Sequence, residues 1–221
     1  DQPMTRGYAC FKGLQAEDEV AAKLLQHLNL LHRWNQAYNL SAVRDPQLML
    51  TQHLLDCLAA LPALDRHLGQ RAARILDVGS GAGLPGVVWA LMRPRWSVVC
   101  VDAVAKKVSF VRQVIGELGL KNLGAEHARV EALRAGECEL ITSRAFASLA
   151  DFTALTRAHL SVDGCWVAMK GKPPEDEIAT LPPWVEVFHV EQLQVPGLDA
   201  QRCLVWMRPA VSETGLTSHP N

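Results

Sequence analysis

The sequence predicts an α/β fold: a doubly wound, mostly parallel sheet with an antiparallel terminal strand, preceded by N-terminal helices. From residue 74 onward, short apolar runs typical of buried strands alternate with segments of helical period, which is the order of a parallel sheet. The first run contains Asp77 and then opens into Gly79, Gly81 and Gly83, where a strand gives way to a helix. The last two runs are joined through Pro196-Gly197, a connection too short for a helix, so we expect them to pair antiparallel.

Length and composition favour one structural domain. The chain has 221 residues, of which 49% are hydrophobic, enough to bury a sizeable core. We expect residues 1–16 and 211–221 to form tails, residues 17–64 a helical extension, and residues 65–210 the sheet-containing domain.

Two helices are predicted before the first strand. Residues 17–40 carry one apolar stripe at helical spacing, made of Val20, Leu24, Leu28, Leu31 and Trp34. Asp45-Pro46 is typical of a helix start, with the aspartate as N-cap and the proline in the first turn. The apolar stripe of this second helix consists of Leu50, Leu54, Leu58 and Leu61.

The remaining elements follow the alternation of strand and helix. The predicted strands are residues 74–79, 97–102, 125–130, 139–143, 165–170, 185–195 and 202–208. Helices are expected from about residue 85 and over 104–118, where Gly119 closes the second of them. Ser148 to Asp151 resembles a capping box that begins a further helix.

The glycine turn is the most informative segment for function. Residues 81–86 formally match G-x-G-x-x-G, the dinucleotide fingerprint, but the match starts after Asp77 and Gly79 have already made the turn. A carboxylate at Asp77 would repel a pyrophosphate and suits a cation better. The alternative is a glycine-rich connector with no ligand.

The arrangement Asp77-x-Gly79-x-Gly81-x-Gly83 resembles motif I of the Rossmann-like class I S-adenosylmethionine methyltransferases, whose cofactor carries an ammonium and a sulfonium and no phosphate. Asp102 ends the second strand about twenty residues past the glycines, the spacing at which a carboxylate reaches the ribose of an adenosine. The alternative role of Asp102 is to cap the following helix, and the two roles are compatible.

Charge, cysteines and histidines limit the other classes of function. The net charge of −1 does not favour nucleic-acid binding, so a polyanion site has to be local. Candidate basic patches, each of which could equally be a solvated surface, are Arg33 with Arg44; Lys106, Lys107 and Arg112; and Lys170 with Lys172.

The cysteines are scattered and the histidines follow no ligand pattern, so the sequence predicts no metal site. It predicts reduced structural thiols at Cys10, Cys57, Cys100, Cys138, Cys165 and Cys203. Without an apolar stretch of membrane-spanning length or a secretory leader, we expect a cytoplasmic protein.

Several blocks together resemble one family, the bacterial RsmG/GidB enzymes. In order along the chain, the blocks are residues 34–45, 53–56, 77–86, 143–147 and 170–171. The resemblance covers residues 17–209. It implies an S-adenosylmethionine-dependent methyltransferase that methylates N7 of a guanine in 16S ribosomal RNA. Carried over by motif, the cofactor contacts would be Gly79, Leu84, Val130, Glu131 and Arg144.

The residues themselves support these roles unevenly. Val130 and Glu131 follow the third predicted strand, at the carboxyl edge where a doubly wound sheet binds its ligand. Glu131 could instead be a simple helix-start acid. Arg144 comes directly after an apolar strand, where a cation more often serves a site than a core. His53 and Asp56, three apart on one helix face, could form a structural pair.

Methyl transfer to N7 needs no general base, because N7 already presents a lone pair. The protein would position donor and acceptor, and Arg144, Lys170 or Asn39 could donate to guanine O6, with His53 as a further candidate site residue. We expect a monomer that acts on 16S ribosomal RNA within a small ribosomal subunit or an assembly intermediate. The alternatives are a methyltransferase for a small molecule or a protein, a nicotinamide-dependent oxidoreductase, and a non-catalytic sensor of an adenosyl ligand.

Overall fold

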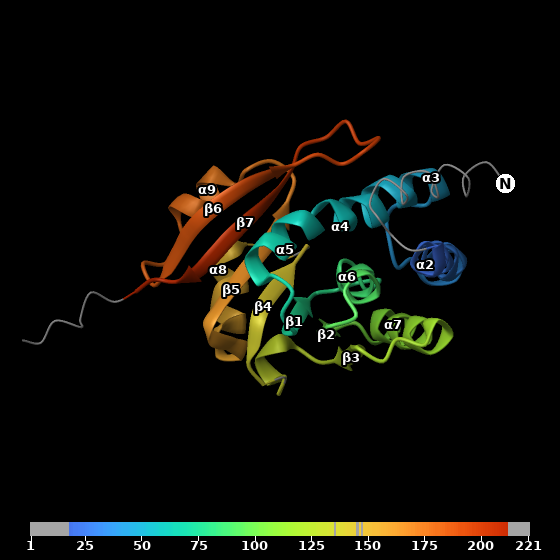
Figure 1. The fold of residues 1–221 in the computed structure, drawn as a ribbon, viewed down its shortest axis with the longest axis horizontal. Coiled ribbons are helices and arrows are strands. Elements are labelled where there is room, and N and C mark those ends of the chain that lie inside the picture. The colour runs from blue at the N-terminus through green and yellow to red at the C-terminus, as the bar shows by residue number, and fades with distance from the viewer. Residues whose placement is uncertain (1–17, 135, 145, 147, 212–221) are drawn as a thin grey trace, which may run out of the picture.

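The computed structural model describes residues 18–134, 136–144, 146 and 148–211, and its centre is one sheet of seven strands (Figure 1). The strands are β1 (Ala73–Val78), β2 (Trp96–Asp102), β3 (Leu123–His127), β4 (Cys138–Ser143), β5 (Leu160–Lys170), β6 (Val185–Leu193) and β7 (Arg202–Pro209). Their order in the sheet is β3-β2-β1-β4-β5-β7-β6. The first five are parallel, and β7 is antiparallel to both of its neighbours. The predicted doubly wound sheet with an antiparallel end is therefore confirmed.

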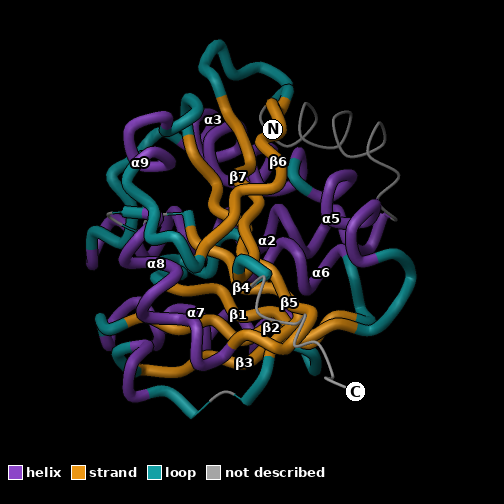
Figure 2. The backbone as a smooth tube through the Cα atoms, turned by 90° about the vertical axis from the view of Figure 1, so that its left-hand side faces the viewer, coloured by secondary structure: helices purple, strands orange, loops and turns teal. Residues whose placement is uncertain are grey.

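Helices cover both faces of this sheet. On one side lie α6 (Gly86–Met92) and α7 (Ala105–Leu118), with α2 (Asp18–Tyr38) packed against both (Figure 1). On the other side lie α8 (Leu149–Thr156) and the short α9 (Glu175–Ala179). The strands form one continuous band, from which β6 and β7 extend at one end (Figure 2). Because successive strand residues point to opposite faces, two apolar cores form, one under each helical layer.

The second predicted helix is broken into four pieces: α3 (Pro46–Met49), a π-helical turn (Leu50–Leu55), α4 (Asp56–Ala59) and α5 (Leu61–Leu68). Its start is as predicted, because the Asp45 carboxylate accepts a hydrogen bond of 2.8 Å from the Gln47 N–H. The break before α5 coincides with Pro62, which has no N–H to continue the helix. The π-helical turn carries His53 and lies directly before Asp56.

Other boundaries differ from the prediction for identifiable reasons. β3 ends at His127, and Val130 instead begins a 3-10 turn, Val130–Ala132. β5 begins at Leu160, five residues before the predicted start, since its first part carries exposed and polar residues that hide the apolar pattern. Helix α9 has no buried residue and gave no apolar period to detect. The predicted tails lie outside the described residues, apart from residue 211, and the predicted division at residues 64/65 stays a prediction.

The ends of the strands position the functional residues. Asp77 and Asp102 lie near the carboxyl ends of neighbouring parallel strands, Arg144 directly follows β4, and Lys170 ends β5. Because β7 runs in the opposite direction, its first residue, Arg202, is near the same edge, where Lys170 pairs with Cys203. None of the helices in the described part of the chain is long and apolar enough to cross a membrane.

Candidate functional site

The turn after β1 leaves its main chain open at two glycines. Gly79 and Gly81 have φ angles of +65° and +57°, a region that side chains disfavour, and nothing lies within 4 Å of the place where a Cβ would stand. The third glycine differs, since a Cβ on Gly83 would meet Val87 Cγ2 at 2.5 Å. Gly83 therefore serves packing against α6, whereas the space beside Gly79 and Gly81 is free for a ligand.

Asp102 locks this turn to the beginning of α7. One carboxylate oxygen accepts from the Gly81 N–H at 3.0 Å and the other from the Val104 N–H at 2.8 Å. The N-cap of α7 is Val104 itself, so Asp102 does not occupy the expected cap position but lies two residues before it. Asp102 also lines a cavity of about 230 Å³, together with Gly79, Val130, Glu131, Phe146 and neighbouring residues.

Asp77 lies beneath the turn, completely shielded from solvent. Its Oδ2 accepts from the Gly86 N–H at 2.8 Å, while its Oδ1 has no hydrogen-bond partner among the described residues. Burial raises the pKa of this carboxyl to about 7, against the opposing effects of the Gly86 N–H and the Arg144 guanidinium. A buried carboxylate oxygen without a partner fits a ligand that brings a cation.

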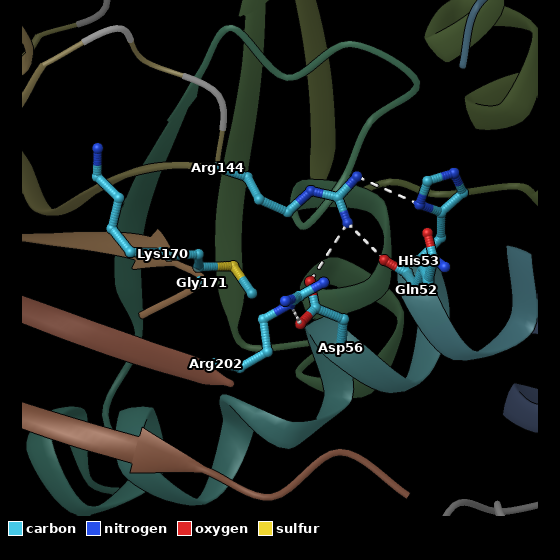
Figure 3. A pocket seen from close by; sticks show the side chains of 8 residues that line it. Gln52, His53, Asp56, Arg144, Lys170, Gly171 and Arg202 are labelled. Carbon is cyan, nitrogen blue, oxygen red and sulfur yellow. Dashed lines mark hydrogen bonds and ion pairs between the residues drawn. The ribbon is translucent and has the colours of Figure 1, made fainter. Parts of the chain in front are cut away.

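A second, polar pocket of about 350 Å³ lies at the ends of β4 and β5 (Figure 3). At its centre, Asp56 is bound by two guanidinium groups: Arg202 Nε lies 3.0 Å from Oδ1, and Arg144 Nη1 lies 3.5 Å from Oδ2. Arg144 Nη1 also donates to the main-chain oxygen of Gln52 at 3.1 Å. Two fixed cations and one buried carboxylate leave this cluster with a net positive charge.

His53 completes the support of Arg144. Arg144 Nη2 lies 3.3 Å from His53 Nδ1, and a guanidinium can only donate, so Nδ1 is the accepting nitrogen of a neutral ring. The ring proton is then on Nε2, which lies 2.8 Å from Ser41 Oγ. Burial and the charge of Arg144 lower the pKa of His53 to about 4, which keeps the ring neutral.

The profile of the GidB family, described as rRNA small subunit methyltransferase G, matches residues 20–205 of this chain. The chain belongs to the GidB family. Curated relatives agree: "Ribosomal RNA small subunit methyltransferase G" of Acidovorax sp. (strain JS42) is 58% identical over 205 residues, covering 89% of this chain and 90% of the relative. The protein of the same name from Methylibium petroleiphilum is 61% identical over 185 residues, covering 84% of each chain.

Solved structures share the fold of this GidB-family chain at low identity. TrmN from Thermus thermophilus aligns with a TM-score of 0.57 and 19% identity, covering 73% of this chain and 53% of that protein. A SAM-dependent methyltransferase from Aquifex aeolicus aligns with a TM-score of 0.52 and 17% identity, covering 74% and 93%. The predicted resemblance to RsmG/GidB and the Rossmann-like methyltransferase fold are thus confirmed.

In this member of the GidB family, four of the nine predicted cofactor residues line one cavity, and Asp77, Gly81 and Gly83 do not line it. The 230 Å³ cavity joins Gly79, Asp102, Val130 and Glu131 from three strand ends. Leu84 is buried within the turn and does not line this cavity. Arg144 is likewise absent from its lining and belongs to the polar pocket, although Phe146, two residues further on, lines the cavity.

The four predicted catalytic residues do not all converge. Arg144, His53 and Lys170 line the polar pocket, but the Lys170 ammonium points away from Arg144 (Figure 3) and pairs with both oxygens of Glu177 at 2.9 and 3.0 Å. Asn39 lines neither cavity: it has a φ of 50° just after α2 and accepts from Arg44 at 2.9 Å. His53 and Asp56 each contact Arg144, in place of the pair with one another that the sequence suggested.

The sequence does not indicate several of the site residues. It places Arg202 only in a predicted strand, but the reversed direction of β7 brings Arg202 to Asp56. Ser41 and Glu177 are also not indicated, and they contact the predicted residues His53 and Lys170.

Among the described residues no group of three or more His, Cys, Asp and Glu side chains could hold a metal ion. The five described cysteines are buried and form no disulfide, while Cys10 lies outside the described residues.

Proposed function

We propose that this protein transfers a methyl group from S-adenosylmethionine to N7 of a guanine in 16S ribosomal RNA of the small subunit. The observation that carries the proposal is that an open glycine turn and a cationic pocket lie along one edge of the sheet of a GidB-family chain. Family membership also favours methyl transfer over the nicotinamide-dependent and sensor alternatives. The names of the relatives support ribosomal RNA over a small molecule or a protein as the substrate.

The residues around the glycine turn fit S-adenosylmethionine. The buried, unpaired oxygen of Asp77 is suited to compensate the charge of the cofactor ammonium. The free space beside Gly79 and Gly81 lets the cofactor approach the main chain closely. Asp102 would accept from the ribose hydroxyls, and the cavity beside Val130 and Phe146 would take the adenine. When bound, the cofactor supplies an electrophilic methyl group on a sulfonium.

The polar pocket fits a methyl acceptor that needs no general base. Among the described residues that line it, the carboxylate of Asp56 is held by Arg144 and Arg202, and the His53 Nδ1 lone pair faces Arg144. Both of these hydrogen-bond acceptors already have partners, so neither is free to remove a proton from the substrate. The N7 lone pair of guanine requires no such removal, which agrees with a pocket that offers donors.

Arg144 is the best candidate to recognise the guanine. Its guanidinium is held by three contacts, to Gln52 O, Asp56 and His53, and is therefore fixed before any substrate arrives. A fixed donor can bond the guanine O6 and orient the ring, since most of the catalytic effect here is positional. As positive charge moves from the sulfonium to the purine, the buried carboxylate of Asp56 offsets the charge of Arg144.

Transfer of labelled methyl from S-adenosylmethionine tests the proposal, with naked 16S RNA, small subunits and ribosomal proteins as separate acceptors. Nucleoside analysis should find the label in N7-methylguanosine. Asp102→Asn should weaken cofactor binding, whereas Arg144→Gln should reduce transfer at saturating cofactor. Label in protein, in another nucleoside, or in none of the acceptors would refute the proposed substrate.

A further inference from the structure

Helix α2 reaches the glycine turn through one buried side chain. His27 is completely buried, and its Nε2 lies 3.1 Å from the main-chain oxygen of Ala82. Ala82 stands between Gly81 and Gly83, in the middle of the turn. The contact joins residues 55 positions apart and crosses from the N-terminal helix to the turn that follows β1.

The direction of this hydrogen bond is fixed by its partner. A carbonyl oxygen only accepts, so His27 Nε2 carries the proton and donates. The other ring nitrogen, Nδ1, has no partner among the described residues, and the ring stacks on Phe110 with centroids 6.0 Å apart. Burial lowers the pKa of His27 to about 4, so the ring is neutral and makes this bond at physiological pH.

Packing alone does not explain an imidazole at this position. A buried nitrogen without a partner is unfavourable, and an apolar side chain of similar volume would avoid it. What the imidazole adds is one donor aimed at the turn. On either side of Ala82, Gly81 and Gly83 have φ angles of +57° and +77°, and glycines without a side chain leave a main chain free to adopt other conformations.

We propose that His27 is a positioning residue for the cofactor: its bond to Ala82 holds the glycine turn in the conformation that binds S-adenosylmethionine. Helix α2 is then a working part of the cofactor site, although it contributes no residue to the cavity lining. The inference rests on the proposed function only in taking S-adenosylmethionine as the ligand of the turn.

Two substitutions separate this role from a structural one. His27→Leu removes the donor and keeps the volume, while His27→Gln keeps an amide donor at similar reach. Removing the ring leaves the Ala82 oxygen buried without a hydrogen-bond partner, but it also eliminates the unpaired Nδ1. Because these two effects offset one another, we expect the melting temperature to change little. Leu31→Ala, on the same helix and fully buried, is the matched control: it should lower the melting temperature without changing cofactor affinity.

The Kd for S-adenosylmethionine, measured by calorimetry, should rise about three- to tenfold in His27→Leu, the effect of one net hydrogen bond, and return most of the way in His27→Gln. The KM for RNA and the kcat at saturating cofactor should stay near the wild-type values. Without cofactor, amide exchange in residues 79–86 should be faster in His27→Leu, because the Gly83 and Leu84 N–H groups bond to Ser80 O within the same turn.

An unchanged Kd in both folded His27 variants would overturn the inference, as would a Kd that rises equally in Leu31→Ala. If His27→Leu does not fold, His27→Met, which also lacks a donor, replaces it. Weaker binding in His27→Met with near-normal binding in His27→Gln supports the positioning role, and equal affinity in the wild type and both variants contradicts it. Failure of the wild-type protein to bind S-adenosylmethionine would instead refute the proposed function, and the inference with it.

Discussion

Replacing Asp77 by Asn should remove a specific pH dependence of stability. With a pKa of about 7 in the folded protein, against 3.8 for a free carboxyl, the native state binds one proton more than the unfolded state between these values. The free energy of unfolding therefore falls as pH rises through this window, by on the order of 4 kcal/mol if the full difference is realised. Asp77→Asn keeps an oxygen that can accept the Gly86 N–H and has no such proton.

The same group should link cofactor binding to proton release. If the cofactor ammonium lowers the pKa of Asp77 well below 6, affinity for S-adenosylmethionine should increase about eightfold from pH 6 to pH 7.5, and binding at pH 7 should release about half a proton. Calorimetry in buffers with different ionisation enthalpies measures this release. Because the cofactor's own amine titrates in both proteins, the difference between wild type and Asp77→Asn isolates Asp77.

Equal pH slopes of unfolding in wild type and Asp77→Asn would refute the assignment of a raised pKa. Equal proton release in the two proteins, with stability behaving as expected, would show that Asp77 is buried and protonated but does not face the ammonium. The two measurements thus separate the electrostatics of the fold from those of the cofactor site.

Two further predictions concern the substrate. Lys170→Ala should depress turnover on RNA about tenfold with little change in cofactor affinity, as expected of a cation on the substrate side. Glu177→Gln, which frees the Lys170 ammonium, is the matched control. A loss of cofactor binding in proportion to the loss of turnover would instead place Lys170 in the cofactor site. RNA carrying 7-deazaguanine at the target position should bind nearly as well as the natural substrate and accept no methyl, since one ring nitrogen has become C–H. Normal methylation of that RNA would exclude N7 as the acceptor.

The central part of the fold was predictable because local signals and the global fold agree there. Apolar runs, the closure of α7 by Gly119 and the caps at Asp45 and Ser148 each correspond to an observed element, since these patterns depend on neighbouring residues only. The π-helical turn at residues 50–55 was not predictable in this way, since its apolar positions are also compatible with a continuous helix.

The site was only partly predictable for a related reason. Glycines and acids at strand ends mark the cofactor side, because chain order alone places them on one sheet edge. Partners in the polar pocket depend on tertiary contacts: Arg202 and Asp56 are 146 residues apart, and Arg144 and His53 are 91 apart. Nothing local to Lys170 indicated that Glu177 would pair with its ammonium.

The engaged state of the pocket acceptors leads to a last prediction, the shape of the pH–rate profile. His53 has a pKa of about 4, and its Nδ1 faces Arg144, so the ring stays neutral from pH 6 to pH 8 and does not ionise in this range. Asp77 titrates in this range, but it affects cofactor affinity, so saturating cofactor removes its influence. Single-turnover methyl transfer with cofactor and RNA both saturating should therefore be nearly flat over these pH values. A rate that rises tenfold per pH unit would instead require an ionising enzyme base, and an acceptor with such a requirement is not the N7 lone pair.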